Sequence, residues 1–309
     1  MGDIVLARGA RGDLVKRVQR SLTGRGFDTG GVDGTFGGDT ETAVRAFQTT
    51  ERLGVSAEVD VATWQALMGL PIPEVRDRAL QVTAGFEGHG FALAQGNYDG
   101  AGLTWGIIGI TIKSGEVSKL LLELERRAPA VIEQAFGAKK DELLNIMASS
   151  RAKQIAWADG LSLGAKKVRL AEPWRSAFGT LGESDEAQAL QRDLASQDYF
   201  EPARRTAAQL GLETELGMAL AFDIHVQNGG IGEGARETIT SEQANHPIPA
   251  GEEQVLRVIV ANAVADSAKP EYREDVRARK LTLATGSGRV HGAFFVLRNW
   301  GLDESPFTA

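Results

Sequence analysis

Residues 97–109 read NYDGAGLTWGIIG, and this stretch distinguishes the expected fold from an all-helical one. A glycine-rich turn around Asp99 runs directly into residues 104–112, where isoleucines recur among glycines as in short strands or a hairpin. Glu87, in the stretch GFEGHGF, precedes Asp99 by twelve residues. We therefore expect one small β element with two carboxylates near it.

The sequence after residue 75 otherwise reads largely as helices. These are predicted over 75–86, 118–127, 129–136, 139–158, 165–178, 184–198, 199–210, 214–228, 251–268 and 271–283. The expected fold class is therefore mainly α, with a small β-hairpin or sheet.

The first 70 residues form a separate unit with three helical patterns. Asp13 is a plausible start for the first helix, the second begins near residue 40, and Asp60 opens the third. Pro71 and Pro73 interrupt any helix and stiffen a short linker. We therefore expect an N-terminal three-helix domain over 1–70 and a second domain over 71–309.

Composition excludes several classes of protein. A chain of 309 residues, with 42% hydrophobic and 24% charged residues, can form two globular domains. The net charge of −7 offers no basic surface for nucleic acid. The absence of cysteine excludes thiolate zinc sites, disulfides and cysteine nucleophiles. No apolar run reaches the about 18 residues that suggest membrane insertion, and no signal peptide is visible.

Three segments of the N-terminal domain carry a resemblance. They read GARGDLVKRVQRSL, VDGTFGGDTETAVRAFQ and VDVATWQALMG, in this order. Together they resemble the small three-helix peptidoglycan-binding domain of many bacterial and phage wall hydrolases. The resemblance implies peptidoglycan as the partner of this domain, with Asp33, Phe36, Thr40 and Gln48 as its motif positions. From the residues alone, Phe36 is expected in the core and Asp33 in a turn.

Glu87 and Asp99 have the pattern that hydrolysis of a glycosidic bond needs. One carboxyl group protonates the leaving oxygen, and the other attacks the sugar or activates a water. Phe86 and Phe91 flank Glu87 and would raise its pKa by lowering local polarity, whereas Asp99 in a polar turn would stay ionised. Thr104, five residues further on, has a hydroxyl that can hold the attacking water.

The segment DGAGLTWGIIGIT at 99–111 resembles the segment DGxGxTxGxxGxT of the family 46 chitosanases, which belong to the lysozyme superfamily. The resemblance implies a lysozyme-like α+β domain with Glu87 as general acid, Asp99 as general base and Thr104 holding the water. The stretch LAFDIHVQNG at 220–229 is similar to a helix that packs behind the cleft in that family. The residues expected to bind substrate are Tyr98, His89, His225, Gln227 and Asn228.

These patterns predict a peptidoglycan hydrolase that cuts the glycan backbone as a muramidase. Inversion is favoured because Thr104 has a role only if a water attacks, and we expect a monomer that needs no metal or cofactor. A phage endolysin, held in the host cytoplasm until lysis and acting at the bacterial wall, suits a chain without a visible signal peptide. Three alternatives stay open: a chitosanase using the same pair, a zinc amidase built from His225, His291 and an acid, and a non-catalytic wall-binding or virion protein.

Overall fold

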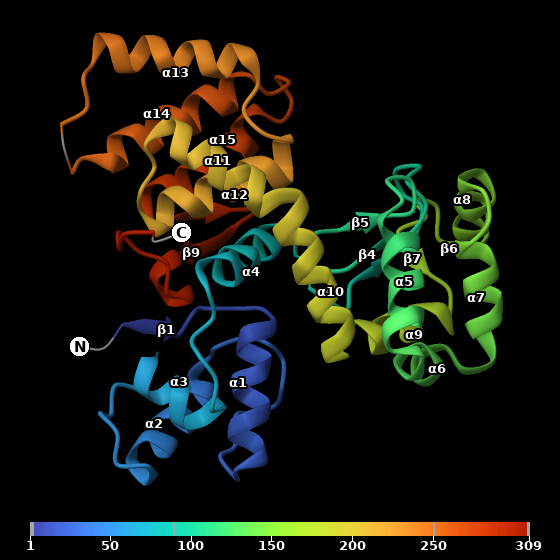
Figure 1. Ribbon diagram of the computed structural model, residues 1–309. Coiled ribbons are helices and arrows are strands. Elements are labelled where there is room, and N and C mark those ends of the chain that lie inside the picture. The colour runs from blue at the N-terminus through green and yellow to red at the C-terminus, as the bar shows by residue number, and fades with distance from the viewer. Residues whose placement is uncertain (1–2, 89, 250, 308–309) are drawn as a thin grey trace. The chain divides into compact units, whose positions relative to one another are not determined.

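The computed structural model describes residues 3–88, 90–249 and 251–307 (Figure 1). The chain divides into two compact units. The first unit combines the chain up to Phe86 with the chain from Ser196 onward, and the second unit runs from Glu87 to Ala195. Helices dominate both units, and the sheets of the described residues are small and antiparallel. The mainly helical fold class is thereby confirmed.

The N-terminal part of the first unit is a three-helix bundle, as predicted. Its elements are β1 (Ile4–Leu6), α1 (Asp13–Gly24), α2 (Gly38–Thr50), β2 (Val59–Asp60) and α3 (Val61–Met68). Asp60 starts α3, because its carboxylate accepts a hydrogen bond of 2.8 Å from the backbone N–H of Thr63. Phe36, Phe47 and Trp64 are buried in the core of the bundle.

The remainder of the first unit is built around one central helix. Residues Glu215 to Ile224 of this helix are all buried, as expected when a helix is surrounded by others. Helices from the preceding and following chain contact it, and the two last helices of the unit lie side by side (Figure 1). The elements are α4 (Val75–Glu87), a π-helix η2 (Ser196–Phe200), α11 (Glu201–Leu210), α12 (Glu215–Asn228), α13 (Glu233–Asn245), α14 (Glu253–Asp266), α15 (Arg273–Thr285), β8 (Ser287–Val290), β9 (Ala293–Val296) and the 3-10 helix η3 (Leu297–Trp300).

The three-helix bundle is joined to the C-terminal segment by hydrogen bonds within the first unit. The backbone N–H of Ala7 donates to the carbonyl of Asn299, within η3, at 2.9 Å. The indole N–H of Trp300 donates to the carbonyl of Arg11, also at 2.9 Å. The bundle and the last helical turn of the chain therefore support each other, while the predicted domain boundary at residue 70 stays a prediction.

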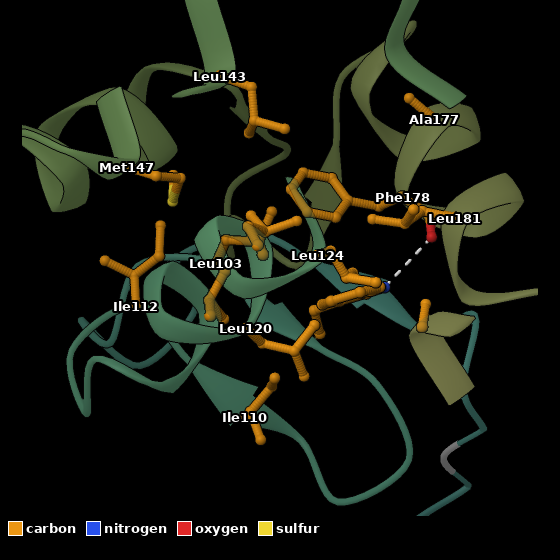
Figure 2. Packing of buried hydrophobic residues seen from close by; sticks show 14 of the residues in the cluster. Leu103, Ile110, Ile112, Leu120, Leu124, Leu143, Met147, Ala177, Phe178 and Leu181 are labelled. Carbon is orange, nitrogen blue, oxygen red and sulfur yellow. Dashed lines mark hydrogen bonds between the residues drawn. The ribbon is translucent and has the colours of Figure 1, made fainter. Parts of the chain in front are cut away.

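The second unit holds the β element predicted at residues 104–112. Strands β3, β4 and β5 form an antiparallel sheet in that order. Residues Leu103, Ile110 and Ile112 from this region contribute to an apolar cluster with Leu124 and Phe178 (Figure 2). The elements are β3 (Ala94–Gln95), β4 (Thr104–Trp105), β5 (Ile110–Thr111), α5 (Glu116–Arg127), α6 (Pro129–Phe136), a 3-10 turn η1 (Gly137–Lys139), α7 (Lys140–Met147), α8 (Arg151–Gly160), β6 (Ser162–Leu163), β7 (Arg169–Leu170), α9 (Trp174–Gly182) and α10 (Asp185–Ala195).

Two of the predicted helices are wrong in extent. The prediction over 139–158 is broken between α7 and α8, and much of the prediction over 165–178 is occupied by the hairpin of β6 and β7. Gly164 has φ of 84° at the start of the hairpin turn, and α9 begins only after Pro173. The helix α13 and the hairpin of β8 and β9 are absent from the prediction.

Candidate active site

Glu87 is the last residue of α4, and its side chain is exposed. The preceding residue, Phe86, is buried and packs edge-to-face on Phe295, with ring centroids 4.7 Å apart. The carbonyl of Phe86 lies 2.8 Å from Nδ1 of His291, and Nε2 of His291 lies 2.7 Å from Asp275. The end of α4 is thus fixed, but the expectation that flanking aromatic rings shield Glu87 is wrong, because Phe86 is directed into the core.

Asp99 lies in an exposed turn between β3 and β4. One oxygen of its carboxylate, Oδ1, accepts a hydrogen bond of 2.9 Å from the backbone N–H of Ala101. The side-chain oxygen of Asn97 accepts a hydrogen bond of 2.8 Å from the N–H of Gly102, so Asn97 bridges the two ends of the turn. Gly102 has φ of 86°, and a Cβ there would lie 3.0 Å from the Cβ of Ile112. We call residues 97–102 the Asp99 turn.

Thr104 follows the Asp99 turn as the first residue of β4. In the sheet it lies opposite Gln95 on β3 and Thr111 on β5. The residue is only 3% exposed, and among the described residues its hydroxyl has no hydrogen-bond partner. A buried hydroxyl without a partner costs about 1–3 kcal/mol. The stability of the fold therefore does not explain why a hydroxyl stands at this position.

The residues expected to bind substrate are found in different places. Tyr98 is 47% exposed and adjoins Asp99, whereas His89 lies outside the described residues. On the last turns of α12, in the first unit, Nε2 of His225 lies 2.9 Å from the hydroxyl of Thr206. Gln227 accepts a hydrogen bond of 2.8 Å from the side chain of Lys280, and Asn228 is exposed.

His225 is a half-buried side chain with a perturbed pKa. Burial lowers the pKa below its usual value, and the charges of Arg205 and Arg236 add to the effect. A neutral imidazole with one nitrogen facing Thr206 can donate or accept a hydrogen bond. The described residues contain no group of three histidine, aspartate or glutamate side chains that could hold a metal ion.

The four motif positions of the three-helix bundle differ in exposure. Asp33 is exposed, and its pKa is lowered by hydrogen bonds from the side chain of Gln19 and the backbone of Thr35. Phe36, Thr40 and Gln48 are at most 1% exposed. Their side chains therefore hold the bundle together from within.

Gln19 is a residue that the sequence did not single out. Its amide nitrogen donates to Asp33 at 2.9 Å and to the hydroxyl of Thr40 at 3.1 Å. Its amide oxygen accepts from the N–H of Gly34 at 2.8 Å. A polar residue on the buried face of α1 is the signal that could have identified it.

Comparisons with known proteins concern the N-terminal bundle and the fold of the larger part of the chain. Residues 11–67 match the family described as "Putative peptidoglycan binding domain". No curated protein matches the chain. A mutant chitosanase from Bacillus subtilis, solved in complex with 6 GlcN, has 18% identity and a TM-score of 0.51, covering 72% of this chain and 98% of its own. A GH46 chitosanase from Gynuella sunshinyii, in complex with chitotetraose, has 19% identity and a TM-score of 0.45, covering 72% of this chain and 97% of its own.

Both resemblances seen in the sequence are therefore confirmed. Residues 11–67 match the peptidoglycan-binding family, and the chain shares the fold of a chitosanase. At 18% identity the second similarity concerns the fold.

Proposed function

We propose that the protein is a peptidoglycan hydrolase that cuts the glycan backbone as an inverting muramidase. Glu87 protonates the leaving oxygen, Asp99 accepts a proton from water, and Thr104 holds that water. The observation that carries the proposal is the buried hydroxyl of Thr104, which lacks a partner among the described residues and directly follows the Asp99 turn. A hydroxyl that is costly in the folded protein is retained where it serves the substrate.

The hydrogen bonding of Asp99 suits a base. Its Oδ1 is occupied by the N–H of Ala101, and no described residue donates to its Oδ2, which is then available for a proton from water. In an inverting reaction this water lies between the two carboxyl groups, which are then about 6.5–9.5 Å apart. Because Glu87 is exposed, the bound sugar chain has to exclude solvent from the acid.

The N-terminal domain supports peptidoglycan as the substrate. A domain that binds the wall raises the local concentration of glycan around the catalytic groups without changing them. Of the four motif positions, Asp33 is the exposed one, and we propose it for contact with the polymer. Action at the bacterial cell wall follows from this partner.

Among the described residues, no helix is both long enough and apolar enough to span a membrane.

The experiment that tests the proposal is digestion of purified sacculi followed by mass spectrometry of the fragments. New muramic acid reducing ends support a muramidase, and glucosamine reducing ends contradict it. Proton NMR of the first products gives the anomer formed, and a retained anomer would contradict inversion. Release of peptide with intact glycan, abolished by a chelator, would instead indicate an amidase.

Substitutions separate catalysis from wall binding. Glu87→Gln and Asp99→Asn should each lower kcat by about 10²–10⁴-fold, because each removes a proton-transfer group. Glu186→Gln is the matched control, since Glu186 is also an exposed acid of the second unit, on α10. If the two variants clear sacculi as fast as the control, the protein degrades sacculi without these two carboxyl groups, and the proposed mechanism is wrong.

A chitosanase is the second candidate, because the fold similarity is to chitosanases. The same acid and base would then act on a deacetylated, cationic polymer. Reducing-end release from chitosan and from sacculi should be measured side by side. Faster release from chitosan would replace the muramidase proposal while keeping the catalytic pair.

A further inference from the structure

The Asp99 turn is connected to α8 by a carboxylate that the proposed mechanism does not use. The side-chain nitrogen of Asn97 donates to Oδ1 of Asp159 at 2.7 Å. Asp159 in turn accepts two hydrogen bonds from Nζ of Lys167, at 2.5 and 2.6 Å. These hydrogen bonds lower the pKa of Asp159, that from Lys167 most and that from Asn97 next. A continuous path therefore runs from Lys167 through Asp159 and Asn97 to Gly102.

The backbone at the start of the Asp99 turn is held by residues of the hairpin of β6 and β7. The N–H of Asn97 donates to the hydroxyl of Ser162 at 2.8 Å, and the N–H of Gly96 donates to the carbonyl of Val168 at 2.9 Å. A Cβ on Gly96 would lie 2.5 Å from the carbonyl oxygen of Lys167, so the two chains are in close contact. The hairpin of β6 and β7 thus lies against Gly96 and Asn97, where the Asp99 turn begins.

Lys167 adopts a backbone conformation that is unfavourable for a lysine. Its φ is 51°, in the left-handed region that favours glycine. Such a residue costs of order 1 kcal/mol and persists where surrounding contacts fix it. Here the N–H of Lys167 closes the hairpin turn by donating to the carbonyl of Gly164 at 3.0 Å, and its Nζ donates twice to Asp159. The hairpin turn thus presents the side chain of Lys167 to Asp159.

We propose that Asp159 is a positioning residue for Asp99, acting through Asn97 on the Asp99 turn. Asp99 is exposed and its one described hydrogen bond is within its own turn, so Asp99 does not tie the turn to the rest of the second unit. A catalytic base has to be held within about 0.5 Å of its productive position. Asp159 supplies this restraint by accepting from Asn97 and is itself fixed by Lys167. The inference rests on the proposed function, because it assigns the turn a catalytic base.

The test compares two similar ion pairs in the second unit. Asp159→Asn removes a carboxylate that is hydrogen-bonded to Lys167 and to the amide of Asn97. The side chain of Asp159 is 39% exposed and that of Lys167 is 45% exposed. Glu142→Gln removes a carboxylate bonded to Lys139 and to the indole of Trp157, with both charged side chains 43% exposed. We expect Asp159→Asn to lower kcat by about 10–100-fold with KM changed less than twofold, because misplacing a catalytic group affects the chemical step. Glu142→Gln should change neither constant.

A double variant and a structural measurement complete the test. If Asp159 acts through Asn97, Asn97→Ala combined with Asp159→Asn should lower kcat no more than the stronger single variant. Hydrogen exchange of the amide of Gly102 should quicken in Asp159→Asn and stay unchanged in Glu142→Gln. Equal kcat and equal exchange in these two variants would overturn the inference.

The result also separates this inference from the proposed function. If the wild-type protein hydrolyses neither sacculi nor chitosan, the proposed function fails, and the assignment of Asp159 fails with it. If the wild-type protein is active and Asp99→Asn is inactive while Asp159→Asn keeps full kcat, only the positioning role fails.

Discussion

Asp223 and Lys280 form an ion pair of 2.5 Å in which neither side chain has any exposed surface. Arg279, equally buried, donates to the same carboxylate at 2.8 Å, and the hydroxyl of Thr83 donates to it at 2.9 Å. One carboxylate on α12 therefore contacts two cations on α15. Because charged groups are costly to bury without partners, Asp223 contributes strongly to the packing of α12 against α15.

Asp223→Asn should lower the free energy of unfolding by about 3–5 kcal/mol, because it removes the charge of a buried carboxylate that two buried cations share. Urea titration followed by tryptophan fluorescence measures the change. Glu201→Gln is the control: Glu201 pairs with Arg204 at 3.2 Å with both side chains 45% exposed, and such a pair contributes less than about 1 kcal/mol. An equal, small loss in both variants would contradict the role given to Asp223.

The same acid should make stability depend on pH. Burial would raise the pKa of Asp223, but Lys280 and Arg279 outweigh burial and lower it from 3.8 to about 2. Its contribution is therefore complete above the unfolded value and is lost as the pH falls from about 4 towards 2, a change of about 2 kcal/mol. The difference in unfolding free energy between the wild type and Asp223→Asn should shrink over this range. A difference that is constant from pH 6 to pH 2.5 would show that Asp223 is not the group that titrates.

Thr104→Val should lower activity without lowering stability. Valine keeps the shape of the side chain but removes a buried hydroxyl that has no partner among the described residues, so the melting temperature should stay the same or rise. We expect kcat to fall by about 10²-fold, as when one group that orients a reactant is removed.

Thr83→Val is the matched control, because the hydroxyl of Thr83 donates to buried Asp223 at 2.9 Å. Its loss should cost about 1–3 kcal/mol of stability and leave kcat unchanged. The role of Thr104 would be ruled out if Thr104→Val kept full kcat on sacculi.

Gln48→Leu should weaken wall binding by unfolding the N-terminal bundle. The side chain of Gln48 is fully buried, donates to the carbonyl of Glu58 at 2.8 Å and accepts from the N–H of Ala57 at 2.9 Å. Leucine would leave the buried N–H of Ala57 without this acceptor, at about 1–3 kcal/mol, and would leave the carbonyl of Glu58 with only the hydrogen bond of 3.2 Å from the hydroxyl of Ser56. Gln65→Leu, at an exposed position of α3, should change neither stability nor binding. Sedimentation with sacculi and thermal melting would test this; weaker binding by a bundle with an unchanged melting temperature would point to direct contact instead.

The sequence predicted those elements whose signals are local. The bundle follows from apolar spacing and from Asp60, whose carboxylate caps α3 within three residues of itself. The strands at 104–112 follow from isoleucines among glycines. Residues 165–170, the turn and second strand of the hairpin of β6 and β7, were predicted as helix. The two-residue strands are too short to show a period of two, and the sequence gives no sign that the backbone of Lys167 is left-handed.

The candidate site could be predicted only in part, for a similar reason. Asp99, Tyr98 and Thr104 belong to one continuous stretch, so their proximity follows from the chain itself. Asp159 lies 62 positions beyond Asn97 in the sequence. No pattern within either segment indicates that the two side chains are in contact. The exposure of Glu87 likewise depends on Phe86 packing against Phe295, which only the folded chain reveals.

The bonds from Ala7 to Asn299 and from Trp300 to Arg11 bring opposite ends of the polypeptide together. Exchange of residues 1–70 for a foreign binding domain would remove Ala7 and Arg11, the hydrogen-bond partners of η3. A chimera built by cutting at the proline linker would thus carry a damaged carboxy-terminal segment. Transplantation of this bundle requires the recipient to bring, or replace, the short 3-10 helix that completes it.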